Sequence, residues 1–285
     1  MFTGRTKNLG VMGWPIAHSL SPVLQNAALK EAGLDYAYVA LPVPPEQLSA
    51  AVAGIRAMGF RGVNVTVPHK SEIIPLLDEV EEDARLIGAV NTVVNEDGIL
   101  KGYNTDATGF LDALKSEGYA PEGKRVCLLG AGGAARAVLR ALAKEKAAKV
   151  SIGVRNPAKA EPLAELFRER VPVEALFWEG EAFTEAMAEA DLLIHTTPLG
   201  MYPKVDGMPP VRLEALKASA LVYDIVYTPA KTRLLREAEA LGHRILNGEG
   251  MLAGQGAAAF RLWTGAEADV ELMKRVLRSC LKGEV

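Results

Sequence analysis

A glycine-rich segment near the middle of the chain restricts the fold more than any other feature. The apolar run 125–129 is followed by Gly130-Ala131-Gly132-Gly133-Ala134-Ala135 and then by a helical pattern over 136–142. In this strand–turn–helix setting, the first glycine permits a tight turn and the second lets backbone approach a pyrophosphate. Unpaired amides at the helix N-terminus then face the phosphates. The segment therefore predicts a dinucleotide site, with a ligand-free structural turn as the alternative.

The alternation of strand and helix patterns predicts an α/β protein of two domains. At 285 residues the chain can bury two cores. We expect a first α/β domain from residues 1–102 plus 250–285, and a Rossmann-like domain with a parallel sheet from residues 103–249. Strands are expected at 9–13, 36–43, 62–67, 91–94 and 99–102 in the first domain, and at 125–129, 149–154, 172–177, 191–196, 220–226 and 244–246 in the second. The helical tail beyond residue 250 is expected to pack on the first domain, with the reaction site in a cleft between the domains.

Composition excludes several classes of protein. A net charge of -3 argues against general binding to nucleic acid or to an anionic membrane. There is no run of 18 apolar residues, and the opening residues 1–5 do not resemble a signal peptide, so we expect a cytoplasmic protein. Two cysteines imply no disulfide framework, and no His, Cys or carboxylate spacing resembles a metal site. The sequence leaves the oligomeric state open, and a homodimer is one of the alternatives.

The loop after the second strand of the nucleotide domain indicates which dinucleotide binds. NAD sites usually carry an acidic residue there, which binds the ribose 2′-hydroxyl. Here the strand 150–154 ends in Arg155-Asn156-Pro157-Ala158-Lys159, which contains no acid. Basic residues are unfavourable at a helix start unless an anion is bound. The loop therefore favours NADP, and a solvated basic loop is the alternative.

Polar residues gather at strand ends in the first domain. They occur in three segments, 13–22, 64–70 and 88–92, with 103–106 close behind the third. Asn64 and Thr66 are expected on the same face of one strand, because strand side chains alternate, and Lys70 lies just past its end. Since ligands of open α/β sheets bind at the carboxyl ends of strands, these groups could bind a molecule with hydroxyls and a carboxylate.

Taken together, these motifs resemble the shikimate dehydrogenase family. They appear in the family's order and span nearly the whole chain: Ser19-Leu20-Ser21-Pro22, Asn64-Val65-Thr66-Val67-Pro68-His69-Lys70, Gly88-Ala89-Val90-Asn91-Thr92, Asn104-Thr105-Asp106, Gly130-Ala131-Gly132-Gly133-Ala134, Asp224-Ile225-Val226-Tyr227 and Gly254-Gln255. The resemblance implies a two-domain α/β enzyme that reduces 3-dehydroshikimate to shikimate with NADPH, a step of aromatic amino acid biosynthesis.

The resemblance also implies roles for particular residues. The family's substrate contacts fall on Ser19, Ser21, Asn64, Thr66, Lys70, Asn91, Asp106, Tyr227 and Gln255. The two serines and Tyr227 would hold the carboxylate, and the others would bind ring hydroxyls. The family's cofactor contacts fall on Gly130, Ala131, Gly132, Gly133, Ala134, Arg155, Asn156 and Lys159, with Ile225 and Gly248 beside the nicotinamide.

Ketone reduction needs a hydride on carbon and a proton on oxygen. The cofactor supplies the hydride, and the candidates for the proton are Lys70 and Asp106, where the family's catalytic pair also falls. Which of the two transfers the proton is not decided by the sequence, and a surface ion pair is the alternative. His69 is interpreted as structural or as flanking the cofactor, and His195, at the end of its strand, is expected to line the cofactor crevice.

Three other functions compete with this one. An NAD-dependent quinate/shikimate dehydrogenase would need an acid after Val154, which is absent, although relaxed specificity for quinate stays open. A different two-domain NADP reductase, such as a methylenetetrahydrofolate dehydrogenase, would not need the paired serines. A non-catalytic sensor of dinucleotides or shikimate-like acids would not need Lys70 and Asp106.

Overall fold

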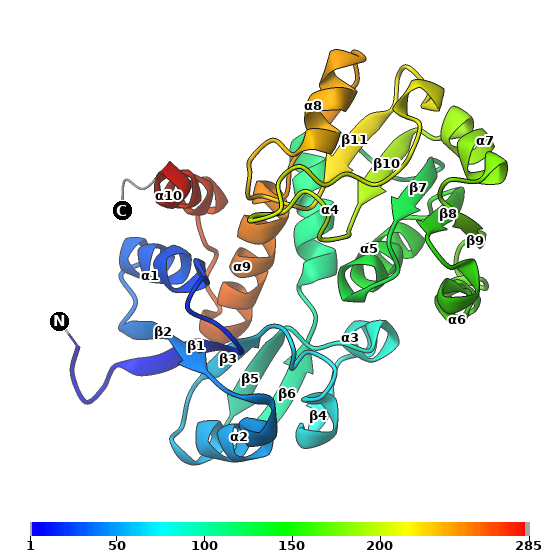
Figure 1. Ribbon diagram of the computed structural model, residues 1–285. Helices are drawn as coiled ribbons and strands as arrows, with labels where there is room; N and C mark the ends of the chain where they lie inside the picture. Colours follow the sequence, from blue (N-terminus) through cyan, green and yellow to red (C-terminus); the bar gives the residue numbers. More distant parts are fainter. Residues whose placement is uncertain (1, 283–285) are drawn as a thin grey trace. The chain divides into compact units, whose positions relative to one another are not determined.

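The computed structural model describes residues 2–282, which form two compact units (Figure 1). The first unit contains the residues up to Gly109 together with those from Leu252 onward, and the second runs from Phe110 to Met251. The chain passes between them inside two helices, α4 (Asp106–Ser116) and α9 (Glu249–Thr264). The fold is α/β, as the sequence predicts.

The first unit is built on a mixed six-stranded sheet. Its strands are β1 (Lys7–Gly13), β2 (Tyr36–Pro42), β3 (Gly62–Val65), β4 (Glu79–Val80), β5 (Thr92–Glu96) and β6 (Ile99–Tyr103), in the order β2-β1-β3-β5-β6-β4. Strand β1 pairs in parallel with β2 and β3, whereas β5 is antiparallel to both β3 and β6. Consequently the end of β3, the start of β5 and the end of β6 lie at one edge of the sheet.

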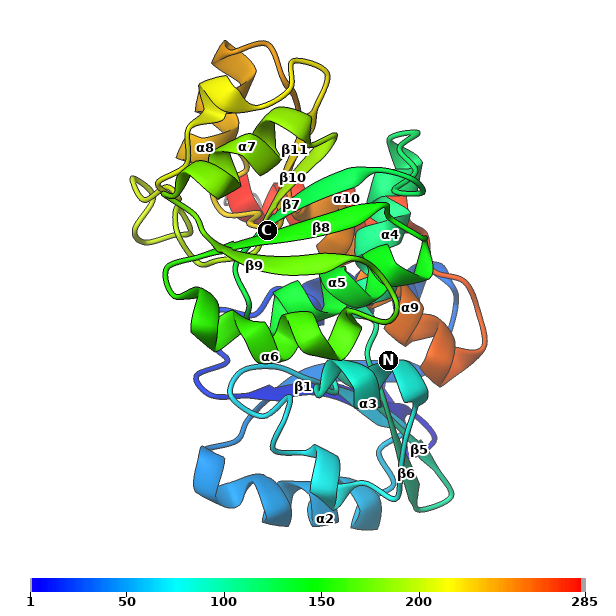
Figure 2. The ribbon, with the colours of Figure 1, turned by 90° about the vertical axis from the view of Figure 1, so that its right-hand side faces the viewer.

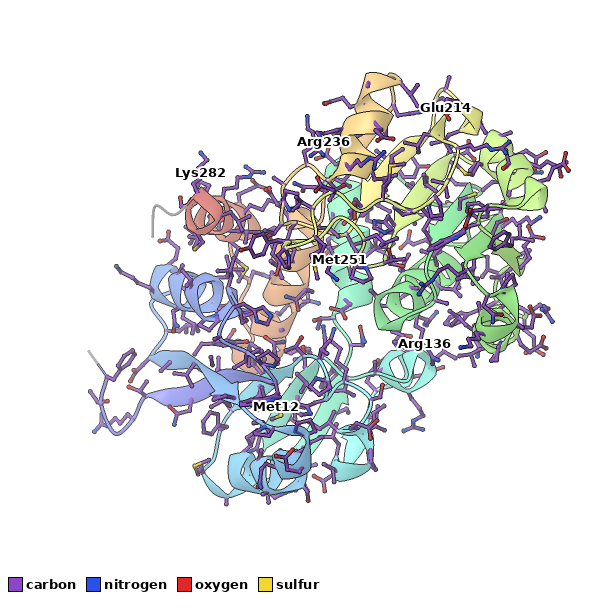
Figure 3. All side chains as sticks on the ribbon, in the orientation of Figure 1. Met12, Arg136, Glu214, Arg236, Met251 and Lys282 are labelled. Atoms are coloured by element: carbon purple, nitrogen blue, oxygen red, sulfur yellow. The ribbon has the colours of Figure 1, made fainter. Side chains whose placement is uncertain are left out.

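Helices cover both faces of this sheet (Figure 1). The helices of the first unit besides α4 and α9 are α1 (Ser21–Glu31), α2 (Leu48–Ala57), α3 (Glu82–Ile87) and α10 (Val270–Lys282), with short 3₁₀ turns at Pro45–Gln47 and Ile74–Leu76. Val52 and Ile55 of α2 pack with Met12 and Val63 of the sheet in one apolar core, and Met12 is labelled in Figure 3. Helix α1 contacts β2 and α10.

The start of α1 differs from the sequence-based expectation. A serine followed by proline is typical of a helix start, which predicts Ser21 as the N-cap of α1. In the structure the capping position is Leu20, and no side-chain hydrogen bond caps it within the described chain. Because Pro22 occupies the first turn, one of the orphan amides is already absent. The Leu24 amide donates to the Leu20 carbonyl at 3.2 Å, so the helix begins one residue before the expected position and the Ser21 hydroxyl does not cap it.

The second unit contains an all-parallel six-stranded sheet. Its strands are β7 (Arg125–Leu129), β8 (Lys149–Val154), β9 (Val173–Phe177), β10 (Leu192–His195), β11 (Leu221–Asp224) and β12 (Arg244–Leu246). The order β12-β11-β10-β7-β8-β9 is that of a Rossmann-like doubly wound sheet, in which the direction of winding reverses between β7 and β10. Ligands of such sheets bind at the carboxyl ends of the strands at this reversal point.

Helices lie on both faces of the second sheet as well (Figure 2). They are α5 (Gly133–Lys144), α6 (Pro157–Phe167), α7 (Glu181–Glu189) and α8 (Arg233–Ala240), with a 3₁₀ turn at Leu213–Ala215. Phe183 and Met187 of α7 share a core with Leu234 and Leu235 of α8. Within residues 2–282, no helix has the length and apolar character needed to cross a bilayer, and no cluster of three metal-ligating side chains occurs.

Gly62 allows α9 to approach the first sheet closely. The indole N–H of Trp263 on α9 donates to the Val93 carbonyl at 2.9 Å, and its ring lies 5.9 Å from that of Tyr38. A Cβ atom at Gly62 would overlap both Trp263 Nε1 and the Val93 oxygen. The absence of a side chain at this position is thus a requirement of the packing.

We expect Gly62→Ala to lower the free energy of unfolding by about 3 kcal/mol, because the added methyl displaces a buried indole and its hydrogen bond. Chemical denaturation of the purified variant measures this. Gly54→Ala is the matched control: its Cβ would meet only Met58 Cε at 3.5 Å, so it should gain about 0.5–1 kcal/mol from helix propensity. Equal stability of Gly62→Ala and the wild type would contradict the packing argument.

Candidate functional site

An ion pair lies at the polar edge of the first sheet. The ammonium of Lys70, which follows β3, donates to Asp106 Oδ2 at 2.7 Å, and Asp106 begins α4 just after β6. The Lys70 side chain is 29% exposed and that of Asp106 is 14% exposed. The pair is therefore more enclosed than a surface salt bridge, while the ammonium still reaches solvent.

Asn91 fixes the other oxygen of Asp106. Its Nδ2 donates to Asp106 Oδ1 at 2.8 Å and to Thr105 Oγ1 at 3.0 Å, while its Oδ1 accepts from the Thr105 amide at 2.8 Å. Asn104 Oδ1 accepts from the Asp106 amide at 3.0 Å, which fixes the first turn of α4. Both carboxylate oxygens of Asp106 thus act as acceptors with defined donors.

The hydrogen-bonded network continues to the buried phenol of Tyr38. Its hydroxyl donates to Asn64 Oδ1 at 2.7 Å, and Asn64 Nδ2 donates to Thr92 Oγ1 at 3.0 Å and to the Asn91 carbonyl at 3.1 Å. Burial raises the pKa of Tyr38 well above its ordinary value, although a hydrogen bond with Ser21 opposes this, so the phenol stays protonated. Asn64 is consequently held in one amide orientation.

The remaining candidates of the first unit occupy different positions around this network. Ser19 Oγ accepts from the Ser21 amide at 3.3 Å, and both serine side chains are half-buried. Thr66 follows β3 and is half-buried, whereas Gln255 on α9 donates from Nε2 to the Leu252 carbonyl at 3.0 Å. His69 is 1% exposed with its ring nitrogen 2.7 Å from the Val43 carbonyl, which favours the structural one of its two interpretations.

Four members of the network were given no role from the sequence: Tyr38, Thr92, Asn104 and Thr105. Their hydroxyls and amides are almost wholly buried. Adjacency to Asn91 and Asp106 was the available signal for three of them. Tyr38 had none, because only the parallel pairing of β2 with β1, and of β1 with β3, brings it near Asn64.

A cavity of about 810 Å³ lies at the carboxyl ends of β7, β8 and β10 in the second unit. Six predicted cofactor residues line it: Gly130, Ala131, Gly132, Arg155, Asn156 and Lys159. Gly133, Ala134, Ile225 and Gly248 lie outside this lining. The cavity contains no acidic side chain among its lining residues, so its charged groups are cationic.

The glycine turn fits a bound pyrophosphate. Gly130 has a φ of 110°, and a Cβ there would lie 2.7 Å from Thr196 Oγ1, so a side chain would be strained and crowded. The N-cap of α5 is Gly132, and no side-chain hydrogen bond caps the helix within residues 2–282. A Cβ atom at Gly132 or at Gly133 would meet no other atom within 4 Å. The first amides of α5 have no partner within the helix, and within residues 2–282 no side chain caps them, so they suit an anion.

Ile225, Tyr227 and Gly248 gather after β11. The Gly248 amide donates to the Val226 carbonyl at 3.1 Å, and a Cβ at Gly248 would overlap the Ile225 carbonyl. Only glycine permits this approach. Tyr227 is half-buried, and burial raises the pKa of its phenol, so it remains a hydrogen-bond donor near neutral pH.

His195 does not line the cavity, contrary to expectation. Its ring is 0% exposed, because it lies between Asp224 and Thr197 and points into the unit. The four residues that follow it, Thr196, Thr197, Pro198 and Leu199, line the cavity instead. Three residues that were not predicted as cofactor contacts also line it: Val154, Ala160 and Trp178. The pairing of β10 with β7 explains this placement.

Family models match three parts of the chain. Residues 11–93 match the shikimate dehydrogenase substrate binding domain, residues 113–200 match shikimate / quinate 5-dehydrogenase, and residues 248–278 match the shikimate 5′-dehydrogenase C-terminal domain. The matched ranges include the network of the first unit and the glycine turn of the second.

Relatives are similar over nearly the whole length. The shikimate dehydrogenase (NADP(+)) of Methanopyrus kandleri is 48% identical over 280 residues, which is 97% of each chain. The shikimate 5-dehydrogenase of Listeria monocytogenes, crystallised with shikimate and NAD, has a TM-score of 0.92 at 39% identity and covers 97% of this chain and 98% of its own. That of Thermus thermophilus, with NADP(H) and shikimate, has a TM-score of 0.87 at 40% identity over 95% and 98%. Identity at this level over almost the full length means that the chain belongs to the shikimate dehydrogenase family.

Proposed function

We propose that the chain is an NADP-dependent shikimate dehydrogenase, an oxidoreductase that catalyses the reversible reduction of 3-dehydroshikimate to shikimate. The observation that carries the proposal is the Lys70–Asp106 pair, held at 2.7 Å within a network of neutral hydrogen-bonding groups. The names of the relatives, shikimate dehydrogenase (NADP(+)), support the substrate and the cofactor. In this role the protein serves the shikimate pathway of aromatic amino acid biosynthesis.

One domain of the chain binds the substrate and the other binds the dinucleotide. Residues 1–102 with 250–285 form the substrate domain, to which the start of α4 adds Asp106, and the network around Lys70 and Asp106 supports this role. Residues 103–249 form the dinucleotide domain, which is supported by the cavity at the glycine turn. Bound NADPH supplies the hydride.

Lys70 supplies the proton and the positive charge. Asp106 accepts hydrogen bonds at both oxygens, so it acts as an anion that orients the ammonium. An ammonium carries three N–H groups, and only one is used by Asp106, which leaves others for the ketone oxygen. Placed there, Lys70 stabilises negative charge as it develops on that oxygen and donates the proton that completes the hydroxyl.

Neutral donors suit the substrate's polyhydroxy acid. Ser19, Ser21 and Tyr227 bind the carboxylate through their hydroxyls, since each can donate without carrying charge. The ring hydroxyls are bound by Asn64, Thr66, Lys70, Asn91, Asp106 and Gln255. Asn91 contributes mainly by orienting Asp106, because both ends of its amide already have partners.

The cofactor's phosphates fit the cationic cavity. Its pyrophosphate binds the amides of Gly130–Ala134, and its 2′-phosphate binds Arg155 and Lys159, with Asn156 between them. Ile225 and Gly248 border the nicotinamide. Exposed basic residues and the absence of a lining acid support NADP over NAD.

The proposal also includes a homodimer in the cytoplasm. Cys127 and Cys280 are not in a disulfide, which fits a reducing compartment. Light scattering tests the dimer, which should have twice the chain mass of 30.4 kDa.

Absorbance of the reduced nicotinamide tests the function, with shikimate or quinate offered against NADP or NAD. We expect shikimate with NADP to give the highest kcat/KM. Comparable turnover of quinate would favour a quinate/shikimate dehydrogenase, the alternative that the second family model supports. Binding of both ligands without turnover would indicate a sensor and overturn the proposal.

Lys70→Ala should lower kcat by about 10²- to 10⁴-fold, because the proton donor is lost, while NADPH still binds. Steady-state kinetics and a binding titration measure the two effects. Lys101→Ala is the matched control, since Lys101 pairs with Glu79 at 3.0 Å on the surface of the same unit and should be dispensable. Wild-type turnover by Lys70→Ala would exclude the assigned role.

Arg155→Asp should raise the KM for NADPH by about 10-fold or more, because a charge-assisted hydrogen bond to the 2′-phosphate is replaced by repulsion. The KM for NADH, which lacks that phosphate, should change by less than about twofold. Arg170→Asp makes the same change of charge on an exposed residue outside the cavity and serves as the control. Equal losses for both cofactors would show that Arg155 does not bind the 2′-phosphate.

Tyr38→Phe should raise the KM for shikimate by about 3- to 10-fold, because Asn64 loses the donor that orients its amide. The KM for NADP should not change. Tyr223→Phe makes the same substitution at a buried hydroxyl that has no hydrogen-bond partner within residues 2–282, so it should leave both KM values unaltered. If the two variants behave alike, the Tyr38 hydroxyl has no positioning role.

A further inference from the structure

We propose that His195 and Asp224 are positioning residues for the cofactor, which act by fixing the Thr197 hydroxyl and with it the wall of the dinucleotide cavity. This inference rests on the proposed function, since it concerns how the same cavity binds NADPH. Neither side chain touches the cavity, and both are 0% exposed. A fully buried pair of titratable groups is costly, so its retention calls for a compensating interaction.

Asp224 is the last residue of β11, and both of its carboxylate oxygens have hydrogen-bond partners. His195 Nδ1 lies 3.0 Å from Oδ1, the Val226 amide donates to Oδ1 at 3.0 Å, and the Thr232 hydroxyl donates to Oδ2 at 2.6 Å. Because a carboxylate only accepts, the proton of the imidazole is fixed on Nδ1. Asp224 thereby sets both the tilt and the tautomer of the His195 ring.

The other ring nitrogen acts on the cavity wall. His195 Nε2 is hydrogen-bonded to Thr197 Oγ1, and Thr197 Oγ1 also accepts from the Leu199 amide at 3.3 Å. Thr197 and Leu199 both line the cavity. One imidazole thus joins the end of β11 to the segment that follows β10.

The segment held in this way lies directly against the glycine turn. Thr196 donates from its amide and from its hydroxyl to the Leu129 carbonyl, at 2.9 and 2.7 Å. A Cβ at Gly130 would lie 3.0 Å from Thr197 Cγ2. A change in the Thr197 rotamer therefore alters the space beside Gly130, where the pyrophosphate binds under the proposed function. The His195–Thr197 bond selects one rotamer in advance of binding, which lowers the ordering cost of the complex.

Two substitutions remove this one hydrogen bond from opposite ends. Thr197→Val deletes the hydroxyl and keeps the shape of the side chain. His195→Asn keeps a donor at the position of Nδ1 for Asp224 and removes the nitrogen that meets Thr197. Each should raise the dissociation constant of NADPH by about 3- to 10-fold, as expected for one lost hydrogen bond. The KM for 3-dehydroshikimate at saturating NADPH should stay within about twofold of the wild type.

The double variant separates positioning from general destabilisation. If His195 acts through Thr197, the double variant should bind NADPH no more weakly than His195→Asn alone. Thr197→Ser keeps the hydroxyl and should restore binding to within about twofold. Thr184→Val is the control, because the Thr184 hydroxyl bonds to the Gly180 carbonyl within α7 and is not part of the cavity lining. It should leave the dissociation constant unchanged whatever its effect on the melting temperature.

Additive losses in the double variant, or wild-type binding of NADPH by Thr197→Val, would overturn the inference. Equal losses for Thr197→Ser and Thr197→Val would also overturn it, since the methyl group would then be responsible. Turnover by the wild-type protein tests the proposed function separately, because the inference depends only on ratios of binding between variants and wild type.

Discussion

The ion pair between Lys70 and Asp106 depends on neutral groups that hold the carboxylate still. An ammonium next to a mobile carboxylate on a surface contributes little, because solvent and side-chain entropy offset the attraction. Here Asn91 binds the second oxygen of Asp106, and Asn104 fixes its backbone amide. Lys70 is the more exposed partner and the one that must reach a ligand. The acceptor of the pair is thus fully hydrogen-bonded, and the donor is the group that solvent and a ligand can reach.

The mixed sheet is what brings these groups together. Lys70 follows β3, Asn91 precedes β5 and Asp106 follows β6. In an all-parallel sheet, the starts and ends of strands lie at opposite edges, so Asn91 could not meet the other two. Because β5 runs antiparallel to both of its neighbours, its start lies beside the two carboxyl ends. The hairpin of β5 and β6 therefore brings Asn91 next to Asp106, and it also contributes Val93 and Leu100 to the apolar core.

Much of the fold could be predicted from the sequence, because hydrophobic period and glycine placement are local signals. The strand–turn–helix at Gly130 and the parallel strands around it appear where expected. Strand β4 has two residues and no periodicity to detect. Leu20 rather than Ser21 is the N-cap of α1, because the Leu20 carbonyl accepts from the Leu24 amide. Pairing registers are not local, so the partners of Asn64 and the burial of His195 could not be predicted from spacing. Lys70 and Asp106 were candidates by motif, whereas the 2.7 Å that separates them follows from the sheet.

Two acid–base pairs of the chain differ in solvent exposure, and this difference separates a pair that can react with a ligand from a pair that only supports the structure. Lys70–Asp106 and His195–Asp224 each combine one cationic or neutral base with a carboxylate whose oxygens are fully hydrogen-bonded. The first pair keeps N–H groups that point away from its partner, so it can exchange a proton with a ligand. The second has every ring nitrogen and carboxylate oxygen engaged and no exposed atom surface, so no ligand can reach it. The His195–Asp224 pair can therefore only position the residues next to it, and one of these, Thr197, lines the dinucleotide cavity.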